Sequence, residues 1–474
     1  MQGKPKALAL ALTCALGATL AACGGSSNSA APKNILFFLG DGMGMTTLTA
    51  ARIYSVGEDG ELTIDQLPET AFVKTYSNDA QVTDSAPSMS AYMTGVKMNN
   101  EVISMSPDTK AITPNADGTG NCGAANGTAV STLLELAKAA GMATGVVTTT
   151  RVTHATPAAT YAHACHRDAE SDIAAQLVPG GTGYNKALAD GVDVVLGGGS
   201  SFFTPTTAGG KRSDARNLID ELQAKGYSYA STGTQLAAID ASKTSKLLGL
   251  FGKSHMDYDL DRINGSLDQP SLADMTSKTL DILGRNKKGY FLMVEGGRID
   301  HALHETTAKK ALQDTVAFDN AIKTGLAKAE ALDPGLKNTL VVVTADHDHT
   351  LVLNGYAART GKTEAGKPGV LGLLRKYQDG SVAKDADGSP YTIIGFGNGE
   401  NRVLGNRSGQ SGLTDTIVGA DTYHQEAVVQ MPAGSETHGG TDVFLGATGK
   451  GADNFHGAID NTRVFSLIRT ATGL

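Results

Sequence analysis

The chain carries little positive charge for its size. Its 474 residues include 40 Lys and Arg against 48 Asp and Glu, which gives a formal net charge of -8. Nucleic-acid binding is driven by basic surface, so nucleic acid is not an expected partner. A negatively charged substrate would need local positive charge, and bound metal cations could supply it.

Cysteine is also scarce, with four residues in the chain. Cys14 and Cys23 belong to an N-terminal segment, which leaves Cys122 and Cys165. An even number of cysteines in an exported chain is consistent with one disulfide. Two buried free thiols are the alternative, because the sequence does not give the distance between the two residues.

Several architectures are absent from the sequence. It shows no internal repeat, no coiled-coil heptads and, beyond the N-terminal segment, no second run long enough to span a membrane. A hydrophobic content of 41% is enough for a sizeable core. The 58 glycines exceed the usual ~7% share, and many lie beside acidic residues or histidines, which favours tight functional loops.

Residues 1–22 have the features of an export signal, because Lys4 and Lys6 precede an apolar run. Leu20-Ala21-Ala22-Cys23, followed by glycine and serine, resembles a bacterial lipoprotein box, in which cleavage precedes Cys23 and its thiol carries the lipid. This predicts a lipoprotein on the periplasmic face of a bacterial membrane, with residues 23–33 as its tether. An ordinary signal cleaved near Ala22, giving a soluble periplasmic or secreted protein, is the alternative.

From Asn34 onward, short apolar runs alternate with helical stretches. The predicted strands are residues 35–39, 71–76, 145–148, 192–196, 290–294, 340–344 and 442–445. Val130, Leu133, Leu134 and Ala137 have the spacing of a helix that stops at Gly141. The alternation predicts an α/β fold with a central, mainly parallel sheet between helices. Residues 34–474 form the predicted domain, and residues 350–435 are an insertion within it.

Acidic residues and histidines follow directly after several predicted strands. Asp41 follows the first strand, Glu295 the fifth, and Asp346 with His347 the sixth. In an open α/β sheet, ligands bind at the carboxyl ends of the strands. These side chains are therefore expected to converge on one site.

Asp84-Ser85-Ala86-Pro87 predicts the start of a helix, because proline is favoured in a first turn. Ser85 then lies about where an N-cap belongs, and helix N-terminal amides would favour its alkoxide. Taken alone, Ser85 could equally be a capping residue, as Asp41 could between its two glycines. Arg167 could hold two phosphate oxygens in a fork, although any surface arginine meets that description.

The segment from Glu295 to His304 is more specific. If a helix begins near Arg298, Asp300 and His304 lie at i, i+4 on one face and can bind one cation, while Glu295 faces another. Asp346, His347 and His438 add ligands of the same kind. Aspartate and histidine ligands without cysteine are typical of an open, catalytic zinc site.

These segments, in this order, closely resemble the alkaline phosphatase family from Asn34 to about Ser466. The resemblance implies hydrolysis of phosphate monoesters through a phosphoserine intermediate, with Ser85 as nucleophile and Arg167 as phosphate clamp. It implies two zinc ions and one magnesium ion. The implied ligands are Asp300, His304 and His438 for the first zinc, Asp41, Asp346 and His347 for the second, and Asp41, Thr156 and Glu295 for magnesium. Residues 350–435 correspond to the family's variable crown region.

Three histidines near these ligands have no assigned role. His154 and His301 stand where the best-studied bacterial members have Asp and Lys, whereas animal and some cold-adapted bacterial members have histidine there. An imidazole beside the third site favours a transition metal more than an all-oxygen site does. The third histidine without an assigned role is His349, three residues after Asp346.

Two alternative functions share part of this pattern. Sulfatases continue the Ser85 motif with Arg where Met89 stands here, and diesterases of the superfamily usually lack the clamp and use Thr as nucleophile. An exported metal- or phosphate-binding lipoprotein would need neither nucleophile nor turnover. The sequence is compatible with a homodimer but does not determine the oligomeric state.

Overall fold

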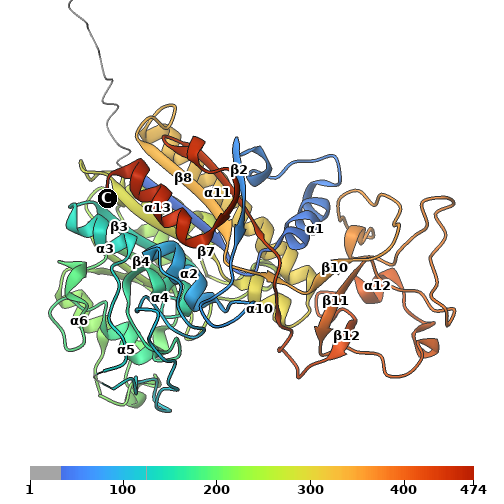
Figure 1. The fold of residues 1–474 in the computed structure, drawn as a ribbon, viewed down its shortest axis with the longest axis horizontal. Helices are drawn as coiled ribbons and strands as arrows, with labels where there is room; N and C mark the ends of the chain where they lie inside the picture. Colours follow the sequence, from blue (N-terminus) through green and yellow to red (C-terminus); the bar gives the residue numbers. More distant parts are fainter. Residues whose placement is uncertain (1–33, 124) are drawn as a thin grey trace, which may run out of the picture. The chain divides into compact units, whose positions relative to one another are not determined.

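The computed structural model describes residues 34–123 and 125–474, and its centre is a ten-stranded sheet. The strand order is β15-β2-β14-β8-β1-β7-β3-β4-β6-β5 (Figure 1). The strands are β1 (Asn34–Gly40), β2 (Glu69–Lys74), β3 (Ala143–Arg151), β4 (Val194–Gly198), β5 (Ser228–Ala230), β6 (Leu247–Leu250), β7 (Tyr290–Gly296), β8 (Thr339–Ala345), β14 (Val443–Gly449) and β15 (Gly457–Asp460). Within this sheet β14 pairs antiparallel with β2 and β8, and the other pairs are parallel. The predicted α/β fold is confirmed.

The central strands are buried on both faces. Every residue of β7 and β8 is buried, and so are all residues of β1 after Asn34. Such continuous apolar strands are typical of a parallel sheet covered by helices. One group of helices comprises α1 (Met45–Val56), α9 (Leu272–Leu283) and α11 (Ala308–Leu332), and the other comprises α2 (Ser85–Thr94), α3 (Leu133–Ala139), α4 (Ala155–Tyr161) and α13 (Asn461–Thr472).

The seven predicted strands all have counterparts, with small shifts at their ends. β4 begins at Val194 rather than Val192, and the sequence missed β5, β6 and β15. The prediction that Val130 belongs to a helix is wrong, because Thr132 caps that helix. The Thr132 side chain accepts a hydrogen bond from the Glu135 N–H, and the Glu135 carboxylate accepts one from the Thr132 N–H.

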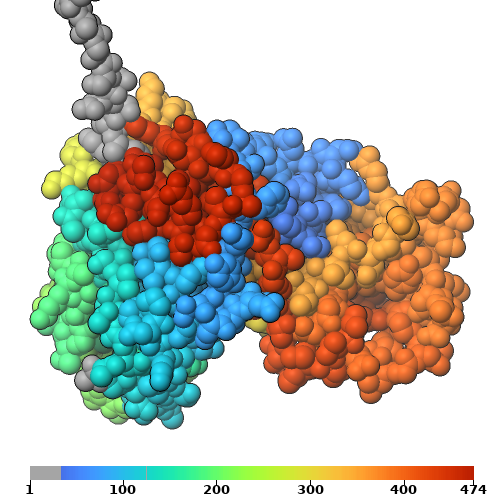
Figure 2. Space-filling view, in the orientation of Figure 1, coloured from blue at the N-terminus to red at the C-terminus, as the bar shows by residue number. Residues whose placement is uncertain are grey.

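Residues 350–435 carry a separate three-stranded sheet in the order β10 (Leu351–Leu353), β11 (Ile394–Gly399) and β12 (Ala427–Gln430). In Figure 2 the orange atoms of this part of the chain gather at one end of the view. The flanks of the insertion meet, because β9 (Asp348–His349) pairs antiparallel with β13 (His438–Gly439). The chain therefore leaves the central sheet after Ala345, and the two flanks of the insertion meet where His349 pairs with His438.

The predicted signal, the predicted tether and Cys23 lie outside the described residues. Among the residues that are described, no helix is both long and apolar enough to cross a membrane. Cys122 and Cys165 form a disulfide, with their Cα atoms 5.8 Å apart.

Candidate metal centre and active site

The candidate side chains lie at the carboxyl ends of the central strands. β1 pairs with both β7 and β8 in a register that places Leu39 opposite Glu295 and Thr344, so the three strands end level with one another. Asp41 follows β1, and Asp346 and His347 follow β8, all fully buried. The turn after Asp41 requires glycine, since Gly42 has φ +67° and a Cβ there would lie 2.5 Å from His349 Nε2.

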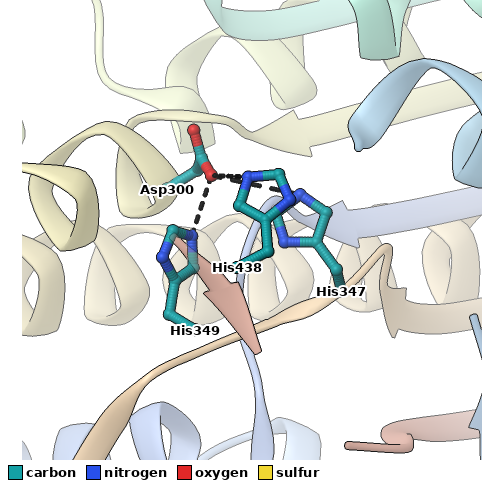
Figure 3. A group of neighbouring side chains, drawn as sticks. All are labelled: Asp300, His347, His349 and His438. Carbon is teal, nitrogen blue, oxygen red and sulfur yellow. Dashed lines mark hydrogen bonds and ion pairs between the residues drawn. The ribbon is translucent and has the colours of Figure 1, made fainter. Parts of the chain in front are cut away.

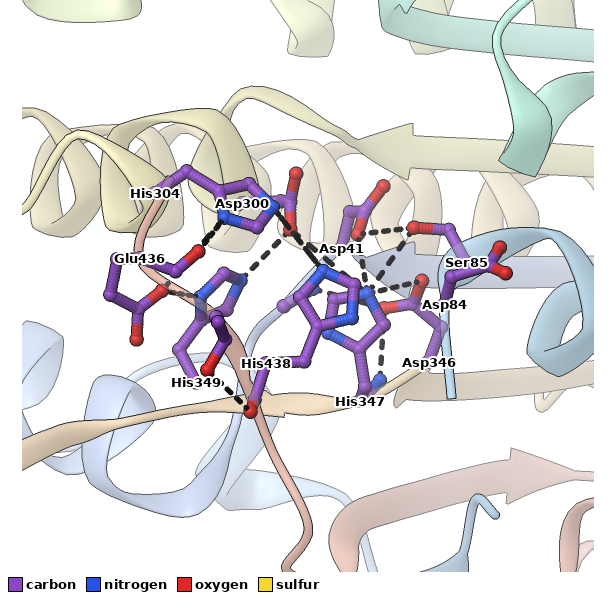
Figure 4. Close-up of polar contacts among 12 residues, drawn as sticks. Asp41, Asp84, Ser85, Asp300, His304, Asp346, His347, His349, Glu436 and His438 are labelled. Carbon is purple, nitrogen blue, oxygen red and sulfur yellow. Dashed lines mark hydrogen bonds and ion pairs between the residues drawn. The ribbon is translucent and has the colours of Figure 1, made fainter. Parts of the chain in front are cut away.

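Ser85 lies at the start of α2, but the prediction that it is the N-cap is wrong. Asp84 is the N-cap, and its side chain accepts a hydrogen bond of 2.7 Å from the Ala86 N–H. Ser85 is therefore the first residue of the helix. Its Oγ lies 3.2 Å from His347 Nε2 and 3.4 Å from Asp41 Oδ1 (Figure 4).

Four potential ligand atoms surround one point beside Ser85. His347 Nε2 lies 3.2 Å from Asp346 Oδ2 and 3.4 Å from Asp41 Oδ1, similar to its separation from Ser85 Oγ. Two atoms that each lie about 2 Å from a tetrahedral zinc ion are separated by about 3.3 Å. Asp346 Oδ2 is buried and has no hydrogen-bond partner. Both observations fit a metal ion held by Asp41, Asp346 and His347.

A second convergent group comprises Asp300, His304 and His438 (Figure 4). Asp300 Oδ1 lies 3.3 Å from His304 Nε2 and 3.5 Å from His438 Nε2, and the two nitrogens are 3.2 Å apart. The predicted helix is present as α10 (Arg298–His304), and it places Asp300 and His304 one turn apart. The spacing again fits one cation.

Backbone carbonyls fix the tautomers of the three histidines in these groups. Nδ1 of His438 donates to the Thr83 carbonyl at 2.8 Å, Nδ1 of His347 to the Asp348 carbonyl at 3.2 Å, and Nδ1 of His304 to the Glu436 carbonyl. A neutral imidazole protonated on Nδ1 presents a lone pair at Nε2. Metal-binding histidines usually make such a second contact. The three Nε2 atoms are the ones that converge.

His349 lies among these residues but has different partners. Its Nε2 is 2.8 Å from Asp300 Oδ1 (Figure 3), and its Nδ1 is 2.5 Å from Glu436 Oε2 (Figure 4). Burial alone would lower its pKa, but the two carboxylates outweigh burial and raise the pKa to about 10. An imidazolium has no lone pair for a metal. The two contacts hold His349 between Asp300 and Glu436, and His349 also belongs to two groups of side chains whose atoms lie close enough to share a metal ion.

A third group consists of Asp41, His154 and Glu295, whose potential ligand atoms lie within 4.8 Å of one another. Asp41 Oδ2 accepts a hydrogen bond of 3.2 Å from Thr156 Oγ1. Glu295 Oε1 and His154 Nδ1 are buried without hydrogen-bond partners. Thr156 therefore contacts Asp41 Oδ2, whereas Ser85 contacts the other oxygen, Oδ1.

The buried carboxylates repel one another. Burial, followed by the charge of Asp300, raises the pKa of Asp41 to about 7. Burial and the charge of Asp41 raise the pKa of Asp346 to about 7 and that of Glu295 well above its usual range. Buried charges require compensation, and divalent cations supply it most directly.

Arg167 lies beside the carboxylates and is connected to α2, the helix that begins at Ser85. Its Nη1 donates to Asp84 Oδ1 at 3.1 Å, and its Nη2 donates to His154 Nε2 at 2.9 Å. Asp84 also caps α2. The guanidinium and Ser85 are therefore positioned by the same carboxylate.

Two residues near the site were not found from the sequence. Glu436 lies two residues before His438, and its carboxylate contacts His349 and Thr350. Its place two residues before the predicted ligand His438 is the signal in the sequence that indicates it. His255 is an isolated histidine between β6 and α8 (Asp259–Asn264), and no local pattern indicates it. Its ring centroid lies 4.2 Å from that of His301 and 5.4 Å from that of His154.

Comparisons with known proteins identify the family of the chain. Residues 32–474 match the family model described as alkaline phosphatase. The chain is 37% identical to the tissue-nonspecific alkaline phosphatase of Rattus norvegicus, over 91% of this chain and 82% of that protein. It is 36% identical to the alkaline phosphatase of Gadus morhua, over 90% of this chain and 88% of that protein.

Solved structures show the same similarity. The alkaline phosphatase of Thermus thermophilus is 26% identical with a TM-score of 0.67, over 94% of this chain and 92% of that one. The cold-active alkaline phosphatase of Shewanella sp. is 25% identical with a TM-score of 0.62, over 92% of this chain and 99% of that one. On the family match, the shared fold and these relatives, the chain belongs to the alkaline phosphatase family of metal-dependent phosphoric monoester hydrolases.

Proposed function

We propose that the enzyme hydrolyses phosphate monoesters through a phosphoserine intermediate on Ser85, at a site for two zinc ions and one magnesium ion. The observation that carries this proposal is the position of Ser85 Oγ. It lies 3.2 Å from His347 Nε2 and 3.4 Å from Asp41 Oδ1, at the same spacing as the ligand atoms themselves.

The ligand chemistry supports the choice of metals. Asp300, His304 and His438 would hold the first zinc, and Asp41, Asp346 and His347 the second, because carboxylate and imidazole ligands without thiolate suit catalytic zinc. Asp41, Thr156 and Glu295 offer only oxygen atoms, which suits magnesium. His154 lies beside this third site.

When bound, the ions would lower the pKa of the Ser85 hydroxyl and stabilise the entering and leaving oxygens of an in-line displacement. Ser85 Oγ attacks phosphorus, the bond from phosphorus to the alcohol oxygen breaks, and phosphoserine forms. Water then displaces Ser85 and releases inorganic phosphate. Arg167 donates two hydrogen bonds to the non-bridging oxygens in both steps, and Asp84 keeps its guanidinium in place.

A direct test compares three substrates on one purified sample. Matched esters of the same alcohol are used: a phosphomonoester, a phosphodiester and a sulfate ester. The proposal expects the monoester to have the highest kcat/KM. A higher value on the diester or the sulfate would overturn it.

The location of the enzyme is a separate proposal, which rests on the sequence of residues 1–33. We propose that Cys23 carries a lipid anchor, that residues 23–33 are a tether and that residues 34–474 are the catalytic domain. Cys23→Ser should move the protein from the membrane fraction to the soluble fraction without loss of activity. Unchanged partitioning would favour an ordinary cleaved signal.

The 350–435 insertion also bears on the oligomeric state of the protein. We propose a homodimer that buries part of this insertion, because Tyr356, Leu404 and Val428 are large apolar side chains that remain exposed on it. Sedimentation of the purified catalytic domain should give twice the mass of one chain. A monomer at micromolar concentration would contradict the proposal.

A further inference from the structure

A second group of side chains lies next to the phosphate clamp, and the mechanism above does not use it. We call it the basic cluster: Arg151, His255, Arg298 and His301. All four side chains are half-buried. The cluster adjoins the clamp through His154, whose Nε2 accepts from Arg167 and whose ring lies 5.3 Å from His301 and 5.4 Å from His255.

His301 has a free donor. Its Nδ1 accepts a hydrogen bond of 2.9 Å from Arg298 Nη1. Because a guanidinium can only donate, the proton of the neutral ring is on Nε2. That N–H has no hydrogen-bond partner among the residues that the structure describes.

His255 has more donors around it than it can accept from. Its Nδ1 lies 3.3 Å from the Arg151 backbone N–H, and its Nε2 contacts Arg151 Nη1. A neutral imidazole accepts at one nitrogen and carries a proton on the other. One N–H of His255 therefore faces another donor and lacks an acceptor.

Arg298 forms no salt bridge in the described part of the chain, although its charge acts on the buried Asp314 carboxyl and opposes the rise in that group's pKa. Arg167 pairs with Asp84 at 3.1 Å, and Arg151 pairs with Glu170 at 2.7 Å. The guanidinium of Arg298 instead lies 3.7 Å from the centre of the Tyr258 ring, and its buried Nε has no acceptor. A half-buried cation without a salt-bridge partner is costly.

We propose that the basic cluster is a second anion subsite, which binds an additional phosphate group of a substrate whose first phosphate is held by Arg167. A phosphate dianion accepts several charge-assisted hydrogen bonds and would satisfy the unmatched donors. A metal ion fits the cluster poorly, since two arginines adjoin the imidazoles. The sets of atoms that could ligate a metal in the described residues also do not include His255 or His301. The inference rests on the proposed monoesterase function.

The test uses two substrates that differ only in the second phosphate, namely 2-hydroxyethyl phosphate and ethane-1,2-diol bisphosphate. The quantity of interest is the ratio of kcat/KM for the bisphosphate to kcat/KM for the monophosphate. Loss of one charge-assisted contact in His255→Ala should lower this ratio by roughly tenfold. His456→Ala, which removes an exposed histidine, is the matched control and should keep the wild-type ratio.

A binding measurement without turnover gives a second readout. Calorimetry with the bisphosphate compares Ser85→Ala with the double variant Ser85→Ala/His255→Ala, and the double variant should bind roughly tenfold more weakly. Elemental analysis should find the same metal content in both proteins.

The outcomes separate this inference from the proposed function. An unchanged ratio and unchanged binding would overturn the subsite, and loss of one metal equivalent in His255→Ala would show that His255 binds a cation instead. A wild-type enzyme that does not hydrolyse 2-hydroxyethyl phosphate would overturn the monoesterase proposal itself.

Discussion

Two regions that both border His154 have opposite hydrogen-bonding imbalances. The metal centre has too many acceptors, since Asp346 Oδ2 and Glu295 Oε1 are buried without donors. The basic cluster has too many donors, and among them Arg298 Nε is buried without an acceptor. Buried polar groups in folded proteins are normally matched. The sign of the imbalance therefore indicates the charge of the missing partner, a cation in the first region and an anion in the second.

Removing cations should have the largest effect, because the acceptor-rich region depends on them entirely. A chelator should abolish activity, and zinc together with magnesium should restore it, since every proposed ligand is an imidazole, carboxylate or hydroxyl. Activity and metal content are measured on the same sample. Undiminished turnover in a sample shown to be metal-free would contradict this account of the acceptor-rich region.

The next largest effect is expected when one carboxylate of that region loses its charge. Asp346→Asn keeps the size of the side chain, but it should lower kcat/KM by on the order of 1000-fold, because a catalytic metal supplies several kcal/mol of transition-state stabilisation. The variant should also retain less metal. Asp453→Asn alters an exposed carboxylate and serves as the control. Near-normal activity with full metal content in Asp346→Asn would remove this residue from the ligand set.

Arg167 lies at the boundary of the two regions, and its removal should have a smaller, substrate-dependent effect. A bidentate contact to a monoester is worth roughly 2 to 4 kcal/mol in a desolvated site, or on the order of 30- to 1000-fold in rate. A diester has two non-bridging oxygens and a second ester group that would crowd the clamp. Arg167→Ser should therefore reduce kcat/KM more for a monoester than for a matched diester. Equal losses on the two substrates would mean that Arg167 does not distinguish them.

The ion pair of His163 with Glu135 lies outside both regions, and its loss should affect stability alone. Nε2 of His163 donates to Glu135 Oε1 at 2.8 Å, and its Nδ1 donates to the Ser104 carbonyl at 2.7 Å. Burial alone would lower the pKa of His163, but the hydrogen bond and charge of Glu135 raise it above 6.5. Burial likewise opposes ionisation of Glu135, but His163 holds the pKa of Glu135 below 4.5.

The sign of the pH dependence follows from these two shifts. The contribution of His163 is fully present below pH 6.5 and is lost as the pH rises through its raised pKa, while that of Glu135 is lost as the pH falls below 4.5. His163→Gln should lower the free energy of unfolding by about 1 to 3 kcal/mol at a pH near 6 and by less at high pH. Denaturant unfolding at both pH values, with His456→Gln as control, measures the difference. The same destabilisation at both would contradict the ion pair.

The sequence predicted the centre of the fold better than its edges. β1, β7 and β8 are continuous apolar runs because both of their faces are buried, and such runs can be recognised without a structure. β5, β6 and β15 have only three or four residues, too few for a clear pattern. The antiparallel direction of β14 depends on where the chain returns after the 350–435 insertion, which no local pattern records.

In the site, too, local sequence patterns predicted some residues and long-range contacts determined the others. Asp300 and His304 were predictable because one helix spaces them. The N-cap was placed one residue too late because Asp84 and Ser85 are adjacent and both are common capping residues. His255 and Glu436 reach the site through contacts with residues distant in the chain, such as His301 and His349. Sequence spacing contains no information on such contacts.

The central claim is that Ser85 is the nucleophile, and trapping of the intermediate tests it most directly. Wild-type enzyme and Ser85→Ala, each with its metal content verified, are incubated with a labelled phosphomonoester, quenched in acid and digested for mass spectrometry. The account predicts labelled phosphate on Ser85 in the wild type and none on the variant, which should keep the fold and the metals. Labelled phosphate on Ser85→Ala would contradict it.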